Sequence, residues 1–512
     1  LDYMAFFQDD WRVRTGLTIN AGVRWDVETP RWERFNRLSY FNPDVASPLA
    51  GPAGLPNLRG GLEFVGVNGN PRKQQDIDWN NIGPRLGLAY SISSKLVLRA
   101  GYGMTFLPTT SRYVNNSNQG FAATTTFFSS VDGINPVGVL RDPFPTGVLP
   151  PPGARGGLAT SVGESFGTLL RKDPIGYSQQ WSANLQFEPF QNLLIDAAYA
   201  GSKGTALPAP YNMNQLDSTL LSQGATLLQQ VPNPFRAFSS PGPLTGANTT
   251  RLQMQRPFPQ FVGLTNNLTS LGMSTYHSFQ LKVNKRLSRG FSILGSYTTG
   301  KLLTDTVPSL VAFLDPAPGF QDTYNRKLDR AVATQDVPQR LVISYVWEVP
   351  AMRGDHSRVL KAAFGGWQVN GITTFQSGLP LVLTNTVPTT SGATRPHNNG
   401  TSPRKEGRVH DRLTAYFNTA VFSAPGPFEF GSTPRTLPDV RTDGLRNFDL
   451  SLFKNFAITE KSTLQLRGEF FNVFNTVRFD APNGAFGTAP FGSINAQENL
   501  PRNVQLALRF SF

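Results

Sequence analysis

The sequence predicts an all-β fold, a large transmembrane antiparallel β-barrel. Three observations predict it. Apolar and polar residues alternate over many long segments, short turns alternate with long Gly- and Pro-rich connections, and no run of about 18 apolar residues suggests a membrane helix. The chain has 512 residues, with 48 Gly and 40 Pro. This length fits several ordinary domains or one very large β architecture.

The alternation is clearest over residues 17–28, where Leu17, Ile19 and Val23 fall on one face of the predicted strand. We count about thirteen such strands of roughly 9–12 residues, longer than most strands of globular proteins and suited to a tilted crossing of a bilayer. The predicted strands are 2–13, 17–28, 84–92, 96–106, 177–188, 193–201, 276–287, 291–300, 339–349, 366–376, 446–456, 463–474 and 503–512.

The connections between these strands fall into two classes. Most hairpin turns are short and the link near residue 358 is moderate, whereas the intervening connections, such as 29–78 and 107–174, are long. Compact soluble domains seldom contain many loops of this length, but outer-membrane barrels combine short periplasmic turns with long external loops. Pairing the strands in order places every short turn on one side and every long loop on the other. The short turns lie near residues 15, 94, 190, 289 and 459.

Two interpretations without a membrane compete with the barrel. One is a soluble multi-domain β protein, such as a propeller or a run of sandwiches, and the other is a fibrous or adhesive β protein. Alternation alone does not separate the soluble form from a membrane barrel. However, we find no repeat of about 40–50 residues, which weakens the propeller interpretation, and the sequence is not low in complexity.

Three features favour the membrane. Charged and small residues occupy the polar face in mid-strand, where an apolar core would make each charge costly but a wet lumen would not. Lys285 and Lys454 interrupt the apolar face beside short turns, where a long side chain can extend to lipid head groups. Aromatic residues gather towards strand ends on the apolar face, as interfacial girdles require. This set is Trp11, Trp25, Tyr90, Phe106, Trp181, Phe187, Tyr199, Tyr297, Trp347, Trp367 and Phe456.

The charge and residue types argue against several other functions. The formal net charge is +13, but Lys and Arg are spread along the chain, so we expect no nucleic-acid binding, and a basic surface facing anionic lipid or an anionic ligand is at least as reasonable. The absence of Cys excludes disulfides and thiolate sites, and the four His show no metal-ligand spacing. We therefore expect neither a metal nor another cofactor.

No motif predicts an enzyme. Asp9 and Asp10, with Asp26, suggest a carboxylate pair or a cation site, but Asp9 and Asp10 point to opposite faces of a strand, which argues against a joint site and favours polar contacts near the turn. The sequence GSKG at 201–204 lacks P-loop spacing and follows a strand into a long loop. His410 precedes Asp411, but no nucleophile-elbow sequence accompanies them. The FNVFN sequence at 471–475 fits a strand end with an aromatic anchor.

Eight stretches, in this order, carry a resemblance to a known family. Examples are FFQDDWRVRTGLTINAGVRWD at 6–26, GEFFNVFNTVRF at 468–479 and the closing PRNVQLALRFSF at 501–512. Together they resemble the C-terminal barrel of TonB-dependent outer-membrane transporters, and within them the Oar-like group, over essentially the whole chain. The other five stretches are 81–106, 198–216, 284–301, 329–350 and 365–381.

The resemblance implies a barrel of roughly twenty-two strands in the outer membrane of a Gram-negative bacterium. Since the chain begins at Leu1 inside a predicted strand, we expect residues 1–512 to be the C-terminal part of that barrel, without the signal peptide, the plug domain and the first strands. The implied partners are outer-membrane lipid, the TonB complex through a missing plug and TonB box, and the barrel-assembly machinery. We expect a monomer.

The implied function is energised uptake of a scarce solute of one of three classes, an oligosaccharide, a peptide or a metal chelate, and the sequence does not choose among them. A plugless passive channel and a surface adhesin or structural barrel remain alternatives. The lumen arginines, with Arg509 among them, would pair with plug carboxylates or attract an anionic substrate, and we favour the plug. The predicted lumen-facing residues are Arg24, Asp26, Arg85, Arg99, Asn184, Gln280, Lys282, Arg467 and Glu469.

The chain ends on an alternating apolar strand that finishes in Phe. Under the resemblance, this pattern is the C-terminal signal presented to the barrel-assembly machinery. Phe512 also suits the aromatic girdle, and the two roles are compatible. The residues that match the signal are Val504, Leu506, Leu508, Phe510 and Phe512.

Overall fold

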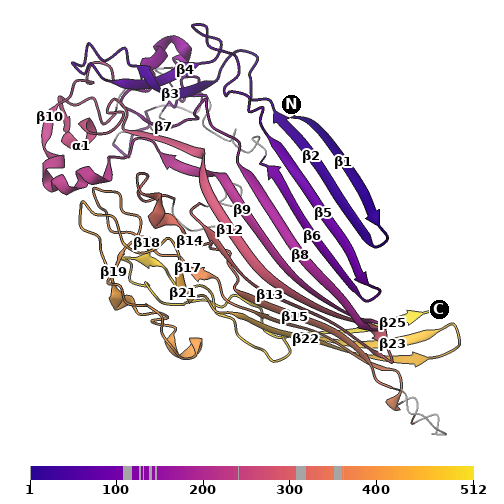
Figure 1. The fold of residues 1–512 in the computed structure, drawn as a ribbon. Coiled ribbons are helices and arrows are strands. Elements are labelled where there is room, and N and C mark those ends of the chain that lie inside the picture. Colours follow the sequence, from indigo (N-terminus) through magenta and orange to yellow (C-terminus); the bar gives the residue numbers. More distant parts are fainter. Residues whose placement is uncertain are drawn as a thin grey trace.

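The computed structural model describes residues 2–107, 118–125, 129–130, 132–137, 141–144, 147–239, 242–306, 319–350, 360 and 363–512. Its centre is one curved antiparallel sheet in which each long strand pairs with the next (Figure 1). All of the predicted strands are present. They are β1 (Asp2–Arg14), β2 (Leu17–Glu28), β5 (Ile82–Ser93), β6 (Leu96–Phe106), β8 (Tyr177–Phe190), β9 (Leu193–Asn212), β12 (Gly263–Ser288), β13 (Phe291–Thr304), β15 (Gln339–Glu348), β16 (Trp367–Gln376), β22 (Leu445–Ala457), β23 (Thr463–Phe471) and β25 (Asn503–Ser511).

The register gives the sheet two chemically different faces. Directly opposite residues of paired strands share a face. Ile19 on β2 lies opposite Leu88 on β5, and Leu466 on β23 lies opposite Leu508 on β25. We call the face that carries these residues the apolar face and the opposite one the polar face. The alternation predicted from the sequence therefore runs in register across the whole sheet.

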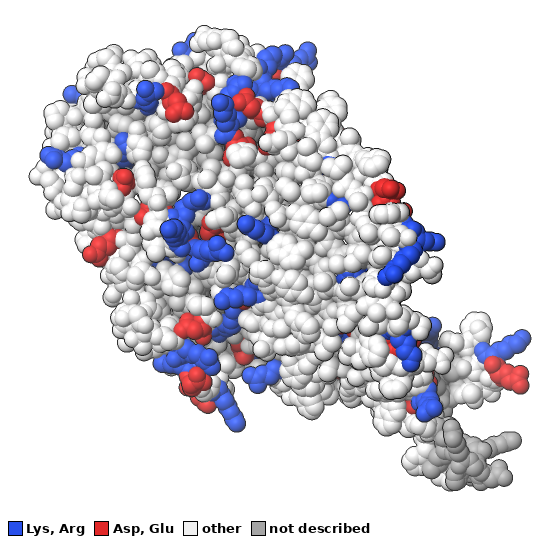
Figure 2. Space-filling view, in the orientation of Figure 1, with Lys and Arg blue, Asp and Glu red and all other residues white. Residues whose placement is uncertain are grey.

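The apolar face is not covered by the protein. Phe7 on β1, opposite Val23, is 71% exposed and Leu506 on β25 is 75% exposed. Figure 2 shows a broad band of sheet with few charged side chains between the loop end of the molecule and the turns. Soluble monomers rarely expose an apolar surface of this extent, so lipid is the solvent that suits this face. Among the described residues, no helix is long and apolar enough to cross a membrane.

The buried cores lie in the long connections, which gather at one end of the sheet, here called the loop end (Figure 1). One core joins β3 (Ser39–Ala46) and β4 (Arg59–Phe64) to later loops, with Phe41 and Phe261 at its centre. A second core, around Leu383 and Phe417, joins the connections that follow β16 and β23. The loops thus fold mainly against one another, with Leu264 at the loop end of β12 contributing to the first core.

Short elements complete the loop end. The short strands are β7 (Ser165–Gly167), β10 (Gln230–Pro232), β11 (Asn248–Thr250), β14 (Ala331–Val332), β17 (Pro380–Leu381), β18 (Thr384–Asn385), β19 (His397–Asn398), β20 (Phe422–Ser423), β21 (Leu437–Arg441) and β24 (Ala485–Phe486). The helical segments are α1 (Arg251–Met254) and the 3-10 turns Gly153–Ala159, Ser218–Leu228, Arg326–Asp329, Val409–Arg412 and Thr419–Val421.

Two strands extend well beyond the predicted bounds. The sequence predicts 193–201 and 276–287, whereas β9 continues to Asn212 and β12 begins at Gly263. The two extensions pair with each other through several register shifts. They were missed because prolines, glycines and polar residues interrupt the alternation once the strands rise past the predicted membrane band. The GSKG sequence at 201–204 therefore lies within β9 and not in a loop.

Two expectations about side chains on the apolar face are wrong. Lys285 and Lys454 do not extend towards lipid head groups, because their ammonium groups donate to carbonyls of neighbouring turns. Lys285 Nζ lies 2.8 Å from the Phe291 carbonyl, and Lys454 Nζ lies 3.1 Å from the Ala363 carbonyl. Tyr297 lies at the middle of β13 and not at an end. The link near 358 lies largely outside the described residues.

Candidate functional site

All nine predicted lumen residues lie on the polar face. Arg85 on β5 is opposite Gly22 and Gly103, and Arg99 on β6 is opposite Asn184 on β8. The same alternation places the rest of the set on this face. Its members are Arg24, Asp26, Arg85, Arg99, Asn184, Gln280, Lys282, Arg467 and Glu469. That the polar face lines a lumen stays a prediction.

Acidic residues of the polar face are held by their neighbours. The Asp196 carboxylate on β9 accepts hydrogen bonds from the Asn184 amide and, at 3.0 Å, from the Gln186 amide. Lys282 on β12 lies directly opposite Asp196. Gln280, two residues before Lys282 on the same strand, lies on the same face. This cluster joins three strands, so it fixes polar groups in the middle of the sheet.

The remaining predicted residues are spread towards the two sheet edges. Arg24 and Asp26 form an ion pair of 2.7 Å on β2. Arg467 on β23 places its guanidinium 4.8 Å from the centre of the Phe453 ring, and Glu469 lies two residues further along. Because β2 and β23 are far apart in the strand order, the set lines a wall and does not converge on one point.

A groove of about 570 Å³ crosses the polar face over β5 to β12. Arg85 lines it, and Tyr276 on β12 stands in its wall. Between them the surface consists of small residues such as Gly101, Ser182 and Ala200. Small side chains keep this part of the wall low, so another folded segment or a ligand can approach the backbone closely.

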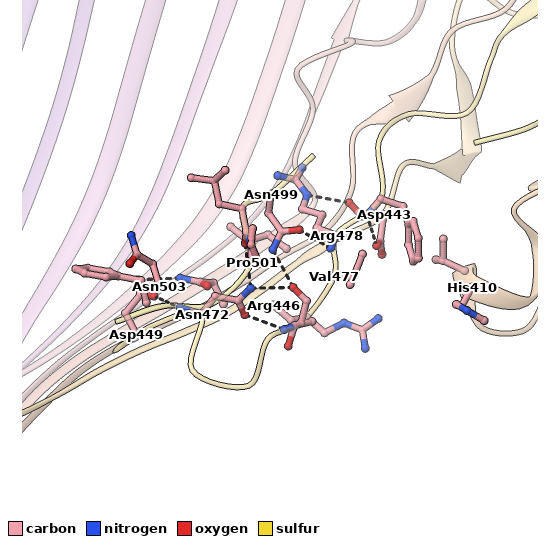
Figure 3. Close-up of a pocket in the computed structure, with 18 of the residues that line it drawn as sticks. His410, Asp443, Arg446, Asp449, Asn472, Val477, Arg478, Asn499, Pro501 and Asn503 are labelled. Atoms are coloured by element: carbon pink, nitrogen blue, oxygen red, sulfur yellow. Dashed lines mark hydrogen bonds between the residues drawn. The ribbon is translucent and has the colours of Figure 1, made fainter. Parts of the chain in front are cut away.

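A second hollow, a cavity of about 780 Å³, lies where β22, β23 and β25 meet the loop end (Figure 3). Asp449 on β22 accepts from the Asn472 backbone N–H at 2.9 Å. Asn472 adopts a positive φ of 51° just after β23, and its amide donates to the Thr476 and Leu500 carbonyls at 3.0 and 3.3 Å. This network holds the connection after β23 against the start of β25, which shapes the cavity floor.

Three arginines line the cavity wall, together with Asp443 and Asp449. Arg478 forms an ion pair of 3.0 Å with Glu498. Arg408 and Arg446 also line the cavity, and neither forms an ion pair within the described part of the chain. His410, whose ring Nδ1 lies 3.4 Å from the neighbouring Asp411 carboxylate, completes this side. Such a wall is suited to carboxylate, phosphate or sulfate groups.

The sequence alone does not predict this cavity. Its residues come from connections that lack periodicity, and they are brought together by loop packing. The FNVFN sequence at 471–475 was a signal for a turn at this place. Asparagine tolerates a positive φ, and Asn472 and Asn475 both adopt one. Within the described ranges, no group of three or more His, Asp or Glu side chains is arranged to hold a metal ion.

The C-terminal residues of the predicted assembly signal lie on the apolar face. Leu506 is opposite Gly468, and Phe510 is opposite Leu464. Phe512 follows the end of β25 and is 95% exposed. Among the described residues, its ring stacks on that of Phe510, with centroids 5.7 Å apart.

Comparison with known proteins identifies the fold family. The family model described as "Outer membrane beta barrel domain" matches residues 1–505. None of the curated proteins compared with the chain matches it. Similar solved structures include the siderophore receptor PiuA from Acinetobacter baumannii, with a TM-score of 0.40, 9% identity and coverage of 100% of this chain and 43% of that one.

Two further solved structures are similar over the whole chain. The ferripyoverdine receptor of the Pseudomonas aeruginosa outer membrane has a TM-score of 0.40 and 11% identity, with coverage of 100% of this chain and 38% of that one. The outer membrane transporter YddB from Escherichia coli has a TM-score of 0.42 and 11% identity, with coverage of 100% and 54%. The chain therefore spans between 38% and 54% of the length of these proteins.

The family match extends over every long strand of the sheet and ends within β25. It confirms the predicted antiparallel barrel fold and the predicted location in the outer membrane of a Gram-negative bacterium. The chain belongs to the family of outer membrane β-barrel domains.

Proposed function

We propose that this chain is the C-terminal wall of a TonB-dependent transporter that takes up a scarce solute. The observation that carries the proposal is the division of the sheet into an apolar face suited to lipid and a basic polar face with a low, small-residue surface. The small side chains leave room for a plug domain to approach the backbone of the wall closely. The eight sequence stretches that resemble these transporters support the same assignment.

In this proposal the chain supplies the last strands of roughly twenty-two. Within the described residues, β1 pairs only with β2 and β25 only with β23. Open strand edges are not tolerated in lipid, so further strands would close the barrel between β25 and β1. The loop end would face the outside and the short turns the periplasm. Solute would then meet the loops and the cavity beside β25 first.

Measurements of ion conductance and of solute uptake distinguish the energised transporter from a passive channel. We would reconstitute the full-length protein into planar bilayers and measure KCl conductance, and we would measure uptake in cells with and without a protonophore. A plugged, energised transporter conducts little ion current and loses uptake when the protonophore is added. Steady conductance of the unmodified protein would establish a passive channel instead. Loss of cell adhesion on loop deletion, with solute uptake intact, would favour an adhesin.

Charge reversal on the polar face is expected to loosen the plug. In the variant Arg85→Glu/Arg99→Glu, two carboxylates face the carboxylates that we assign to the plug, and like-charge juxtaposition of this kind costs several kcal/mol. We expect KCl conductance to rise well above that of the unmodified protein. Arg404→Glu, in an exposed loop ion pair, is the matched control and should leave conductance low. Equal conductance of the two variants would argue against plug contact at Arg85 and Arg99.

Deleting Phe512 is expected to reduce barrel assembly without weakening the folded protein. Because the side chain is 95% exposed, its removal eliminates few contacts. We therefore expect most of the folded protein to disappear from the outer membrane, while the remainder keeps its unfolding temperature. Phe512→Trp, which retains a terminal aromatic ring, should assemble normally. Normal yield after the deletion would remove the assembly role from this residue.

A further inference from the structure

A cavity of about 330 Å³ lies inside the loop end, where three long connections meet. Leu216 and Arg256 come from the connection between β9 and β12, Gln321 from that between β13 and β15, and Thr394 from that between β16 and β22. We call this hollow the loop cavity. It shares no lining residue with the cavity beside β25. Figure 1 shows α1, which precedes Arg256, in the loop end.

The loop cavity contains a guanidinium that lacks a counter-charge. Arg256 Nη1 donates to the Asn214 and Val262 carbonyls at 3.2 and 2.8 Å. Within the described ranges, its buried Nε has no hydrogen-bond partner, and no ion pair includes Arg256. Burial lowers the pKa of the guanidinium, and no carboxylate of the described residues opposes that shift. Arginine keeps its charge nevertheless, and a buried charge is costly unless it is paired.

A hydroxyl in the wall of the same cavity also lacks a partner. Thr394 Oγ1 is buried and forms no hydrogen bond with the described residues. Its backbone is held in place, because the Thr394 N–H donates to the Gln321 side-chain carbonyl at 3.2 Å. The Gln321 backbone carbonyl in turn accepts from the Gln215 amide at 2.8 Å. Since buried polar groups are nearly always paired in folded proteins, two unpaired ones in one cavity indicate a ligand that completes them.

Apolar side chains form another part of the wall. Leu216 and Leu221 are buried in one cluster, against which Leu252 and Phe430 pack, and all four line the loop cavity. A neutral sugar would leave the Arg256 charge unpaired, and a plain hydrocarbon acid would leave the Thr394 hydroxyl unpaired. The ligand therefore needs an anionic group, an apolar group and a polar group between them. The volume is at the lower end of the range for ligand pockets, so it suits one end of a longer molecule.

We propose that the loop cavity binds the carboxyl-terminal residue of a short peptide that ends in an apolar side chain. The carboxylate pairs with the Arg256 guanidinium through Nε, a charge-assisted hydrogen bond. The apolar side chain packs on the cluster around Leu216 and Leu221, and the last peptide N–H donates to Thr394 Oγ1. In making this peptide the solute that is taken up, the inference rests on the proposed function, but binding itself requires no uptake.

The test is isothermal titration calorimetry of the purified full-length protein in detergent. The probes are tripeptides that end in leucine, phenylalanine or valine, each prepared with a free carboxyl terminus and as the carboxyl-terminal amide. We expect at least one free acid to bind about 10- to 100-fold more tightly than its amide, as one hydrogen bond between charged groups implies. Equal affinity of acid and amide, or no binding of any acid at millimolar concentration, would overturn the proposal.

Variants assign the binding to its residues. Arg256→Gln should lower the affinity for the acid to that for the amide, whereas a merely structural role would weaken both equally and keep the preference. Arg251→Gln is the matched control, because Arg251 lies on α1 in the same connection and is not among the described residues that line the cavity. It should keep the full preference for the acid. A retained preference in Arg256→Gln would refute the pairing of that residue with the carboxylate.

A second variant covers a failure of Arg256→Gln to fold, as judged by its mobility in unheated gels. Thr394→Val removes only the hydroxyl and should weaken acid and amide alike, by about 2- to 10-fold. Unchanged affinities in Thr394→Val would contradict the proposal. The two proposals of this section and the last fail separately, since a preference for the acid together with steady KCl conductance would contradict the transporter and leave the peptide site in place.

Discussion

Leu281→Arg is expected to destabilise the barrel by about 2–4 kcal/mol, whereas Gln280→Arg beside it should change the free energy of unfolding very little. Leu281 lies on the apolar face at the middle of the predicted lipid band, opposite Tyr297. Gln280 lies on the polar face, opposite Thr298. An arginine at Leu281 must be buried in hydrocarbon, while one at Gln280 stays in the wet interior.

The measurement is urea-induced unfolding of the full-length protein in phosphatidylcholine vesicles, monitored by tryptophan fluorescence. The two variants are matched because they place the same side chain on adjacent residues of one strand. If Gln280→Arg were as destabilising as Leu281→Arg, the assignment of the two faces to lipid and lumen would be wrong.

A thiol scan checks the same assignment without a large energetic change. The chain contains no Cys, so a single introduced thiol is the only one that a maleimide can label. Gln280→Cys should react with a water-soluble maleimide in vesicles, and Leu281→Cys should not. If the two thiols were labelled to the same extent in vesicles, the assignment of the faces to lipid and lumen would be contradicted.

The strands could be predicted from the sequence because lipid enforces alternation on every residue that crosses it. Arg24, Arg85 and Arg99 were assigned to one face by parity alone, and the register places them there. Prediction failed where that constraint ends. β12 begins at Gly263, since pairing above the membrane needs no apolar face.

The loop end was beyond prediction for a different reason. Its contacts join residues that are distant in sequence and show no periodicity, such as Asp329 and Arg395, whose side chains form an ion pair of 2.8 Å. The cavity beside β25 arises in the same way, from Arg408 in one loop and Arg478 in another. Charges in Gly- and Pro-rich connections are usually solvated, so nothing in the sequence distinguished these from their neighbours.

The Asp329–Arg395 pair connects two long loops and is fully buried, with exposures of 0% and 1%. Arg435, also buried, donates to the Thr304 carbonyl at 3.3 Å. Burial raises the pKa of Asp329 to about 6, and the guanidiniums of Arg395 and Arg435 oppose that rise. The carboxylate is therefore ionised at neutral pH and balances part of the buried positive charge.

Asp329→Ala is expected to open the loop end locally, at a cost of about 3–5 kcal/mol, because it leaves Arg395 buried without its carboxylate. The Gln321 side chain reports on this opening, since its carbonyl accepts from the Thr394 and Arg395 backbone N–H groups, each at 3.2 Å. Amide hydrogen exchange of these two groups in the full-length protein should accelerate by about 100-fold or more at pH 7.

The matched control is Glu406→Ala, which removes the acidic partner of an exposed pair of 3.1 Å with Arg404 in the same loop. Exposed pairs contribute little, so exchange should stay unchanged. Replacing both buried partners, in Asp329→Leu/Arg395→Met, should restore part of the protection because an apolar pair needs no counter-charge. If Asp329→Ala exchanged no faster than Glu406→Ala, the two loops would have to be held together by their hydrogen bonds and apolar contacts, and the buried charges would have no part in closing the loop end.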